Sequence, residues 1–130
     1  MARNTRIFSD LDLNFTAHPV TKDIAIRYDE NAIKTALKNL IFTQNYERPF
    51  HSEIGSPIKA MLFDLATPVL IATLDRILTD LITNFEPRVV LLNVESNISP
   101  DENSVYITIT FAILNTTRPL TLDVVLERTR

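Results

Sequence analysis

The chain has 130 residues, of which 45% are hydrophobic and 22% charged, and its formal net charge is −3. This length suits one domain with an ordinary core. The slightly negative net charge argues against the excess of positive charge that is typical of a nucleic-acid-binding protein. Cysteine is absent and Gly55 is the only glycine, which excludes disulfides, thiolate zinc sites and glycine-rich phosphate loops. No apolar run reaches the roughly 18 residues of a transmembrane helix, and no signal-peptide core follows the N-terminus. We therefore expect a single domain over residues 1–130, made in the cytosol, that binds no cofactor, nucleic acid or membrane.

Two short extended segments are expected near the N-terminus. In residues 7–15 apolar and polar side chains alternate, so that one side carries Leu11, Leu13 and Phe15 and the other carries Asp10, Asp12 and Asn14. This pattern predicts a short amphipathic strand, or an extended arm, with a solvated polar face. Residues 23–28 form the second such segment, with Ile24 and Ile26 on one face.

Three helices are expected in the middle of the chain. The first covers Glu30–Phe42, because Asp29 is a suitable N-cap and apolar residues then recur at helical spacing. Ser56-Pro57 and Thr67-Pro68 each combine an N-cap residue with a proline at the first helical position. They predict a short helix over residues 57–65 and a long helix over residues 68–85.

The loop between the first two helices contains Arg48-Pro49-Phe50 and the single glycine, Gly55. A chain with so little glycine is expected to keep it where the backbone requires it. We expect Gly55 to mark a positive φ or a close approach of two backbone segments, with an ordinary turn as the alternative.

The last third of the chain alternates with the period of β-strands. Three apolar sets occur in turn: Val90, Leu92 and Val94, then Val105, Ile107, Ile109, Phe111 and Ile113, and finally Leu120, Leu122, Val124 and Leu126. The connections between them are rich in turn residues and too short for parallel crossovers. The expected fold class is therefore α+β, an antiparallel β-meander with the three helices packed on one face.

Helical and strand periodicity meet at Glu86-Pro87-Arg88. Proline disfavours helical backbone in the residue before it, so the long helix is expected to end by Glu86. A carboxylate at the negative, C-terminal end of the helix dipole is unfavourable unless a cation or a hydrogen-bond donor lies close to it. Arg88 or a partner protein could supply that group.

Two sets of residues are candidates for catalysis or metal binding. Asp10 and Asp12 lie two apart on the first strand and could form a paired-carboxylate or hard-metal site, but a solvated strand face explains them better. His18 and His51 have neither helical spacing nor cysteine ligands nearby, so we expect no metal site.

The last strand, residues 120–127, ends almost at the C-terminus and can border the sheet. An uncovered edge strand can pair with a strand of another protein. The alternative is a hairpin whose edge is covered by the chain's own arm.

An ordered set of short motifs resembles a known family. These are Phe8-Ser9-Asp10-Leu11-Asp12, Arg48-Pro49-Phe50, Glu53, Gly55, Leu62-Phe63, Thr67-Pro68 and Glu86-Pro87-Arg88. In order and spacing they are similar to the baseplate wedge proteins and sheath initiators of contractile phage tails. This is the family of phage gpW and its T-even relatives, also found in type VI secretion baseplates.

The resemblance implies a structural subunit of the virion's tail baseplate, assembled in the host cytoplasm. It implies that Glu86, Pro87 and Arg88 contact the helical core bundle of the wedge. Arg48 and Phe50 would contribute to that contact, with a local structural role as the alternative. The C-terminal strand, with Leu120, Leu122 and Val124, would template the first ring of sheath subunits.

Members of this family have also been labelled lysozyme-like, which leaves a peptidoglycan hydrolase as the rival hypothesis. Its two acids would be Glu86 with Asp10 or Asp12. The chain has no tryptophan and three tyrosines to stack on sugar rings, and an arginine beside Glu86 stabilises the ionised carboxylate. We therefore expect no enzymatic activity.

Overall fold

The computed structural model describes residues 7–63, 67–114 and 116–127. It divides into two compact units, Met1–Ala36 and Leu37–Arg130. Helix α1, Asp29–Phe42, begins in the first unit and ends in the second. The expectation of a single domain stays a prediction, and the two units are described separately below.

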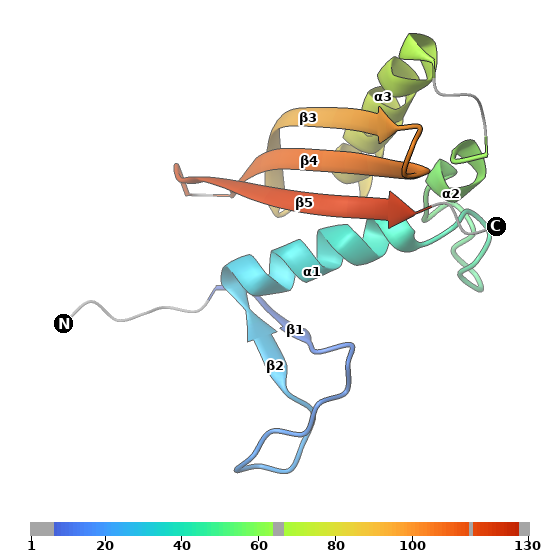
Figure 1. Cartoon of the computed structure of the whole chain (residues 1–130). Helices are drawn as coiled ribbons and strands as arrows, with labels where there is room; N and C mark the ends of the chain where they lie inside the picture. Colours follow the sequence, from blue (N-terminus) through green and yellow to red (C-terminus); the bar gives the residue numbers. More distant parts are fainter. Residues whose placement is uncertain (1–6, 64–66, 115, 128–130) are drawn as a thin grey trace. The chain divides into compact units, whose positions relative to one another are not determined.

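The first unit contains a small antiparallel sheet. Strand β1, Ser9–Leu11, pairs with β2, Ile26–Tyr28, so that Ser9 lies opposite Tyr28 (Figure 1). An isolated bridge between Ala17 and Ile24 continues the pairing beyond the strands. Each predicted extended segment contains a strand, but both strands are shorter than the predicted ranges, residues 7–15 and 23–28. Their pairing with each other is an addition that alternation alone did not specify.

The predicted faces of β1 and the residues after it are wrong in part. Leu11, Leu13 and Phe15 are exposed, whereas the Asp12 side chain, expected in solvent, is buried. A two-stranded sheet is too small to bury an apolar face by itself. A buried carboxylate needs hydrogen-bond donors, and those of Asp12 are described with the candidate sites.

Helix α1 starts one residue before its predicted position. The carboxylate of Asp29 accepts hydrogen bonds from the backbone N–H groups of Ile7 at 2.8 Å and Phe8 at 3.0 Å, which ties the helix start to the segment before β1. The predicted apolar stripe is buried, including Ile33, Leu37 and Ile41.

In the second unit, the start of helix α3, Pro68–Phe85, is confirmed. The Thr67 hydroxyl accepts the N–H of Leu70 at 3.2 Å, and Pro68 occupies the first helical position. Helix α2 is shorter than predicted and covers Ile58–Met61, while residue 65 lies outside the described part.

Ser56 was expected to cap α2, and this prediction is wrong. Its hydroxyl donates to the carbonyl of Ile41 at 2.7 Å, and Pro57 occupies the N-cap position without a side-chain cap. The serine therefore ties the end of α1 to the loop that precedes α2.

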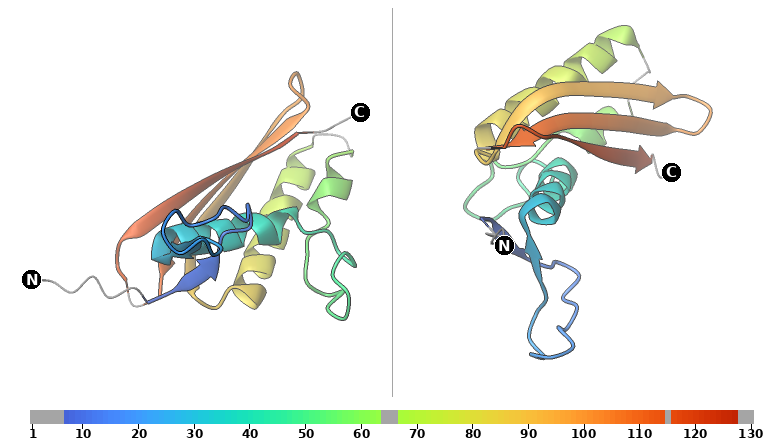
Figure 2. Two further views of the ribbon diagram at one scale, coloured as in Figure 1. Left: turned by 90° about the horizontal axis from the view of Figure 1, so that it is seen from below. Right: turned by 90° about the vertical axis from the view of Figure 1, so that its left-hand side faces the viewer.

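Three long strands form the main sheet in the order β3-β4-β5, with both pairs antiparallel. They cover Val89–Ser99, Ser104–Ile113 and Pro119–Glu127. Helix α3 lies along one face of this sheet and contacts β3 (Figure 2). The α+β meander with three helices is confirmed, and the core includes Leu74, Leu78 and Ile82 from α3 with Ile107, Ile109 and Phe111 from β4.

In the first half of β3, the residues predicted to face the core are the wrong ones. Val89 is buried, whereas Val90 and Leu92 are 48% and 56% exposed. The register with β4 shifts between Leu91 and Asn93, as in a β-bulge. A bulge adds one residue to one strand and thereby changes which residues face the core. The alternation read from Val90 through Val94 therefore crosses from one face to the other.

Candidate partner-binding surfaces

The Glu86-Pro87-Arg88 junction links the end of α3 to the first residue of β3. The N–H of Glu86 still donates to the carbonyl of Ile82 at 3.0 Å, but its own backbone has left the helical region. The carbonyl of Arg88 accepts the N–H of Leu114 at 2.8 Å, just beyond the end of β4. The junction is thus fixed to the helix on one side and to the sheet on the other.

The carboxylate of Glu86 is bound by the guanidinium of Arg88. The Arg88 Nε donates to Oε1 at 2.7 Å and its Nη2 donates to Oε2 at 3.0 Å. The side chains are 8% exposed for Glu86 and 24% for Arg88. Two parallel charge-assisted bonds make this a strong and geometrically specific pair. The cation that the sequence predicts beside the Glu86 carboxylate, at the end of the helix, is therefore Arg88 of the same chain.

A shallow groove lies beside the ion pair, between the last turns of α3 and the start of β3. It is lined by Thr79, Thr83, Glu86, Pro87 and the β3 residues from Val89 to Val94. Pro87 is exposed, as are Val90 and Leu92, the two apolar side chains that the bulge leaves on the outer face. The predicted junction residues thus border an exposed apolar surface, and the two β3 side chains were not identified from the sequence.

Strand β5 borders the sheet, with β4 on one side. Within the described part of the chain, no other strand pairs with it. The side chains of Leu120 and Val124 are buried and that of Leu122 is half-buried, so these residues belong to the core. Any partner contact at this edge would use the backbone and the exposed Thr121, Asp123 and Val125.

Arg48 and Phe50 lie on an exposed loop, residues 44–56, which we call the aromatic loop. Phe50 is fully exposed and has a φ of 68°, and Tyr46, with a φ of 67°, is 84% exposed. Gly55 has a φ of 146°, and a β-carbon there would lie 2.6 Å from the backbone oxygen of Gln44. Both expectations for the glycine, a positive φ and a close approach, are confirmed. Tyr46 was missed, because nothing in its sequence context indicates a positive φ.

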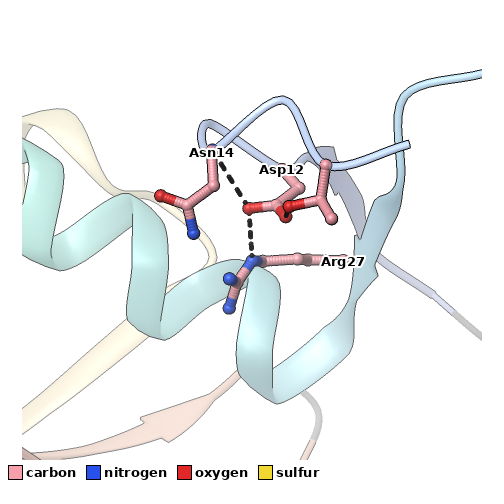
Figure 3. Close-up of polar contacts among 4 residues, drawn as sticks. Asp12, Asn14 and Arg27 are labelled. Atoms are coloured by element: carbon pink, nitrogen blue, oxygen red, sulfur yellow. Dashed lines mark hydrogen bonds and ion pairs between the residues drawn. The ribbon is translucent and has the colours of Figure 1, made fainter. Parts of the chain in front are cut away.

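Asp12 holds together the turn that follows β1. One carboxylate oxygen accepts from the N–H of Asn14 at 3.3 Å and from Nε of Arg27 at 3.0 Å, and the other accepts from the Thr16 hydroxyl at 3.1 Å. Figure 3 shows Arg27 reaching from β2 beneath this turn. The N–H of Asn14 has the largest effect and lowers the pKa of Asp12, burial opposes it, and Arg27 and Thr16 lower it further. An acid kept ionised in this way is suited to holding the turn rather than to donating a proton.

The two histidines have local partners. His18 Nδ1 accepts the N–H groups of Val20 and Thr21, both at 3.3 Å, and His51 pairs with Glu53 at 3.2 Å. The pKa of Glu53 is lowered, first by its own backbone N–H and then by His51. Among residues 7–63, 67–114 and 116–127, no three His, Cys, Asp or Glu side chains form a group that could hold a metal ion. The helices in these ranges are also too short or too polar to cross a membrane.

Several solved structures share this fold. A proposed tail lysozyme from Geobacter sulfurreducens aligns with a TM-score of 0.66 at 20% identity, covering 75% of this chain and 89% of that protein. A chain of the anti-feeding prophage baseplate gives 0.65 at 18% identity, covering 91% of this chain and 83% of its own length. A chain of the type VI secretion baseplate complex gives 0.59 at 16% identity, covering 74% and 92%. At these identities the likeness shows the fold alone.

Sequence comparison is more specific. Baseplate wedge protein gp25 of Enterobacteria phage T4 is 29% identical over 117 residues, which cover 88% of this chain and 86% of the T4 protein. The family model described as baseplate wedge protein gp25 matches residues 27–118, a range that includes the aromatic loop and the Glu86-Pro87-Arg88 junction. Since the match covers more than half of the chain and confirms the resemblance of its motifs, this chain belongs to the baseplate wedge protein gp25 family.

Proposed function

We propose that this chain is a structural subunit of the baseplate wedge that binds the helical core bundle of the wedge and templates the growth of the tail sheath. The expected location, the tail baseplate of a virion, agrees with the family. The observation that carries the proposal is the open groove beside the braced Glu86-Pro87-Arg88 junction, with the exposed apolar side chains of Val90 and Leu92, inside the range matched by the family model.

The groove is suited to the apolar side of a helix. Val90 and Leu92 supply exposed apolar surface, and Pro87 stands at one end of the groove. Helices commonly bind such grooves through apolar residues spaced one turn apart. The Glu86–Arg88 pair fixes the backbone that carries Pro87, so little order has to be gained on binding. In this proposal the pair shapes the contact surface.

Outward-facing residues test the wedge contact without disturbing the core. Replacing Val90 and Leu92 together by aspartate should leave the isolated chain folded, because both side chains are about half exposed. The variant should no longer co-purify with the wedge core proteins of the same phage, since charged groups would have to be buried in the contact. Val69→Asp is the matched control, because Val69 is 75% exposed at the opposite end of α3. Unchanged co-purification of the double variant would refute the groove as the binding site.

The proposed sheath template is the outer edge of β5. Backbone N–H and C=O groups of alternate residues face that edge and can extend the sheet with a strand from a sheath subunit. The strand cannot simply be deleted as a test, because Leu120, Val124 and Leu126 are part of the core.

A proline can remove one outward N–H and leave the rest of the strand in place. Adjacent residues direct their N–H groups to opposite edges, so we would compare Leu122→Pro with Asp123→Pro. Each proline variant is compared with alanine at the same position, which accounts for the lost side chain, because Leu122 is half-buried and Asp123 accepts a hydrogen bond from Thr108. The proline variant that is as stable as its alanine counterpart has lost only an outward donor, and its baseplates should fail to initiate sheath. Normal sheath growth on those baseplates would contradict the template.

We further propose that the chain has no hydrolase activity. Both carboxylate oxygens of Glu86 are bound by Arg88, and the lowered pKa of Asp12 keeps that group ionised. Neither carboxyl group has the features of a general acid in glycoside hydrolysis. Purified protein should not clear cell walls, whereas clearing that is lost in Glu86→Gln would establish the lysozyme-like alternative.

A further inference from the structure

The aromatic loop, residues 44–56, is closed at its base. Gln44 and Ser56 form an isolated parallel bridge, and the N–H of Ser56 donates to the carbonyl of Thr43 at 2.8 Å. At Gly55 the two chain segments approach so closely that no β-carbon would fit. A compact loop whose ends meet in this way is an Ω-loop, a type that frequently carries function.

The loop presents two aromatic side chains to solvent at a cost in backbone energy. Tyr46 and Phe50 both have left-handed backbone conformations, which are outliers for bulky residues and are unfavourable by about 1–3 kcal/mol each. Burial within the described chain does not compensate for this, because Tyr46 is 84% and Phe50 100% exposed. Such strain at exposed side chains is typical of a surface that is completed by something else.

The charges of the loop are arranged around Arg48. The carboxylate of Glu47 accepts the N–H of Gln44 at 2.8 Å, and Glu53 pairs with His51. Arg48 itself is exposed, and no carboxylate in the described part of the chain pairs with it. The two neighbouring acids are thus held within the loop, while Arg48, between Tyr46 and Phe50, is exposed and has no counter-ion among the residues that the structure describes.

We propose that the aromatic loop inserts Phe50 into an apolar pocket with a carboxylate rim on another protein of the baseplate wedge. Tyrosine and arginine are the residues most enriched among interface hot spots, together with tryptophan. Arg48, which no described carboxylate pairs with, selects an acidic rim by charge complementarity. This inference rests on the proposed function only in taking the partner from the baseplate. It assigns a third surface, separate from the groove and from the β5 edge.

Photo-crosslinking locates the partner of the loop. A benzoylphenylalanine residue in place of Phe50, in chains built into purified baseplates, should form a crosslink to another baseplate protein. Mass spectrometry of the crosslinked peptide should find apolar residues with Asp or Glu beside them. The same photoreactive residue at Val69, also strongly exposed, is the control. Absence of a crosslink at position 50, or a peptide without carboxylates, would overturn the proposal.

Charge reversal measures the contribution of the arginine. Arg48→Glu should weaken binding to wedge proteins purified as a complex without this chain by about 30-fold, the effect of a hot-spot residue. Arg76→Glu, at an exposed arginine on α3, should bind like the wild type. Equal effects of the two reversals would show only a general charge effect and would refute the loop.

The groove variant separates this inference from the proposed function. If the Val90 and Leu92 aspartate variant binds normally and Arg48→Glu does not, the groove is refuted as a binding site and the loop is supported as one. If only the groove variant loses binding, the loop inference fails and the wedge contact stands.

Discussion

Replacing Arg88 by alanine should destabilise the isolated chain by about 3 kcal/mol. The variant leaves the Glu86 carboxylate, 8% exposed, without its two guanidinium bonds. Breaking a buried ion pair from one side costs about 3–5 kcal/mol, and we take the lower end because Arg88 is 24% exposed. As a check, unit charges about 4 Å apart at an effective dielectric of about 20 attract by about 4 kcal/mol before desolvation is subtracted.

The opposite truncation should cost less. Glu86→Ala leaves the more exposed member of the pair, and water can solvate part of the guanidinium, so we expect a loss of about 2 kcal/mol. The double variant should lose about 3 kcal/mol, less than the sum, which gives a coupling energy of about 2 kcal/mol.

Urea unfolding of the isolated chain, followed by far-ultraviolet circular dichroism, measures the three free energies of unfolding. Each kcal/mol should also move the thermal midpoint by about 2–8 °C. If the losses from Glu86→Ala and Arg88→Ala simply add in the double variant, the two groups are not coupled and the reasoning is wrong. A Glu86→Ala loss larger than that of Arg88→Ala would refute the assignment of the less exposed partner as the critical one.

Three further predictions concern the turns and loops. The pKa of Asp12 is lowered from 3.8 in the folded chain, so its ionised form stabilises the fold above that pH, and this contribution is lost as the pH falls below it. The difference in unfolding free energy between wild type and Asp12→Asn, measured by urea titration, should therefore shrink below about pH 4. Gly55→Ala should lose about 3 kcal/mol in the same assay, because the new β-carbon combines a strained φ with a contact of 2.6 Å to the Gln44 backbone, and wild-type stability would contradict this. Phe50→Gly should raise the free energy of unfolding by about 0.5–1 kcal/mol, because relief of the left-handed conformation exceeds the entropy cost of glycine; a fall in stability would show that the aromatic ring contributes to the fold.

Features set by neighbouring residues were predictable from the sequence. The start of α3 follows from Thr67 and Pro68, which act on the turn directly after them. The apolar faces of β4 and β5 follow from strict alternation, since most of their inward side chains are buried. The electrostatic need at the end of α3 is also local, and Arg88 stands two residues from Glu86.

Features set by distant partners were not predictable. Ser56 has the sequence of an N-cap, but its hydroxyl bonds the carbonyl of Ile41 instead. Alternation places the charged Asp12 in solvent, because it does not show the partner Arg27. Arg27 lies opposite Asp10 in the β1–β2 register, and its side chain reaches Asp12 only when the two strands pair. The β3 bulge likewise depends on register with β4, and it is what turns Leu92 outward beside the candidate groove.

Apart from its one glycine, the described part of the chain places six other residues at positive φ: Phe15, Lys22, Asp29, Tyr46, Phe50 and Asn103. Most of these positions lie in surface turns, away from the hydrophobic interior. Heat tolerance can therefore be engineered from outside, by placing glycine or asparagine at Phe15 and Lys22 while the packed layers stay untouched. Thermal stability and baseplate assembly can then be compared between these variants and glycine variants at Tyr46 and Phe50. A turn whose replacement raises stability without affecting assembly is strained for no functional reason, whereas a turn whose replacement impairs assembly is strained because binding requires that conformation.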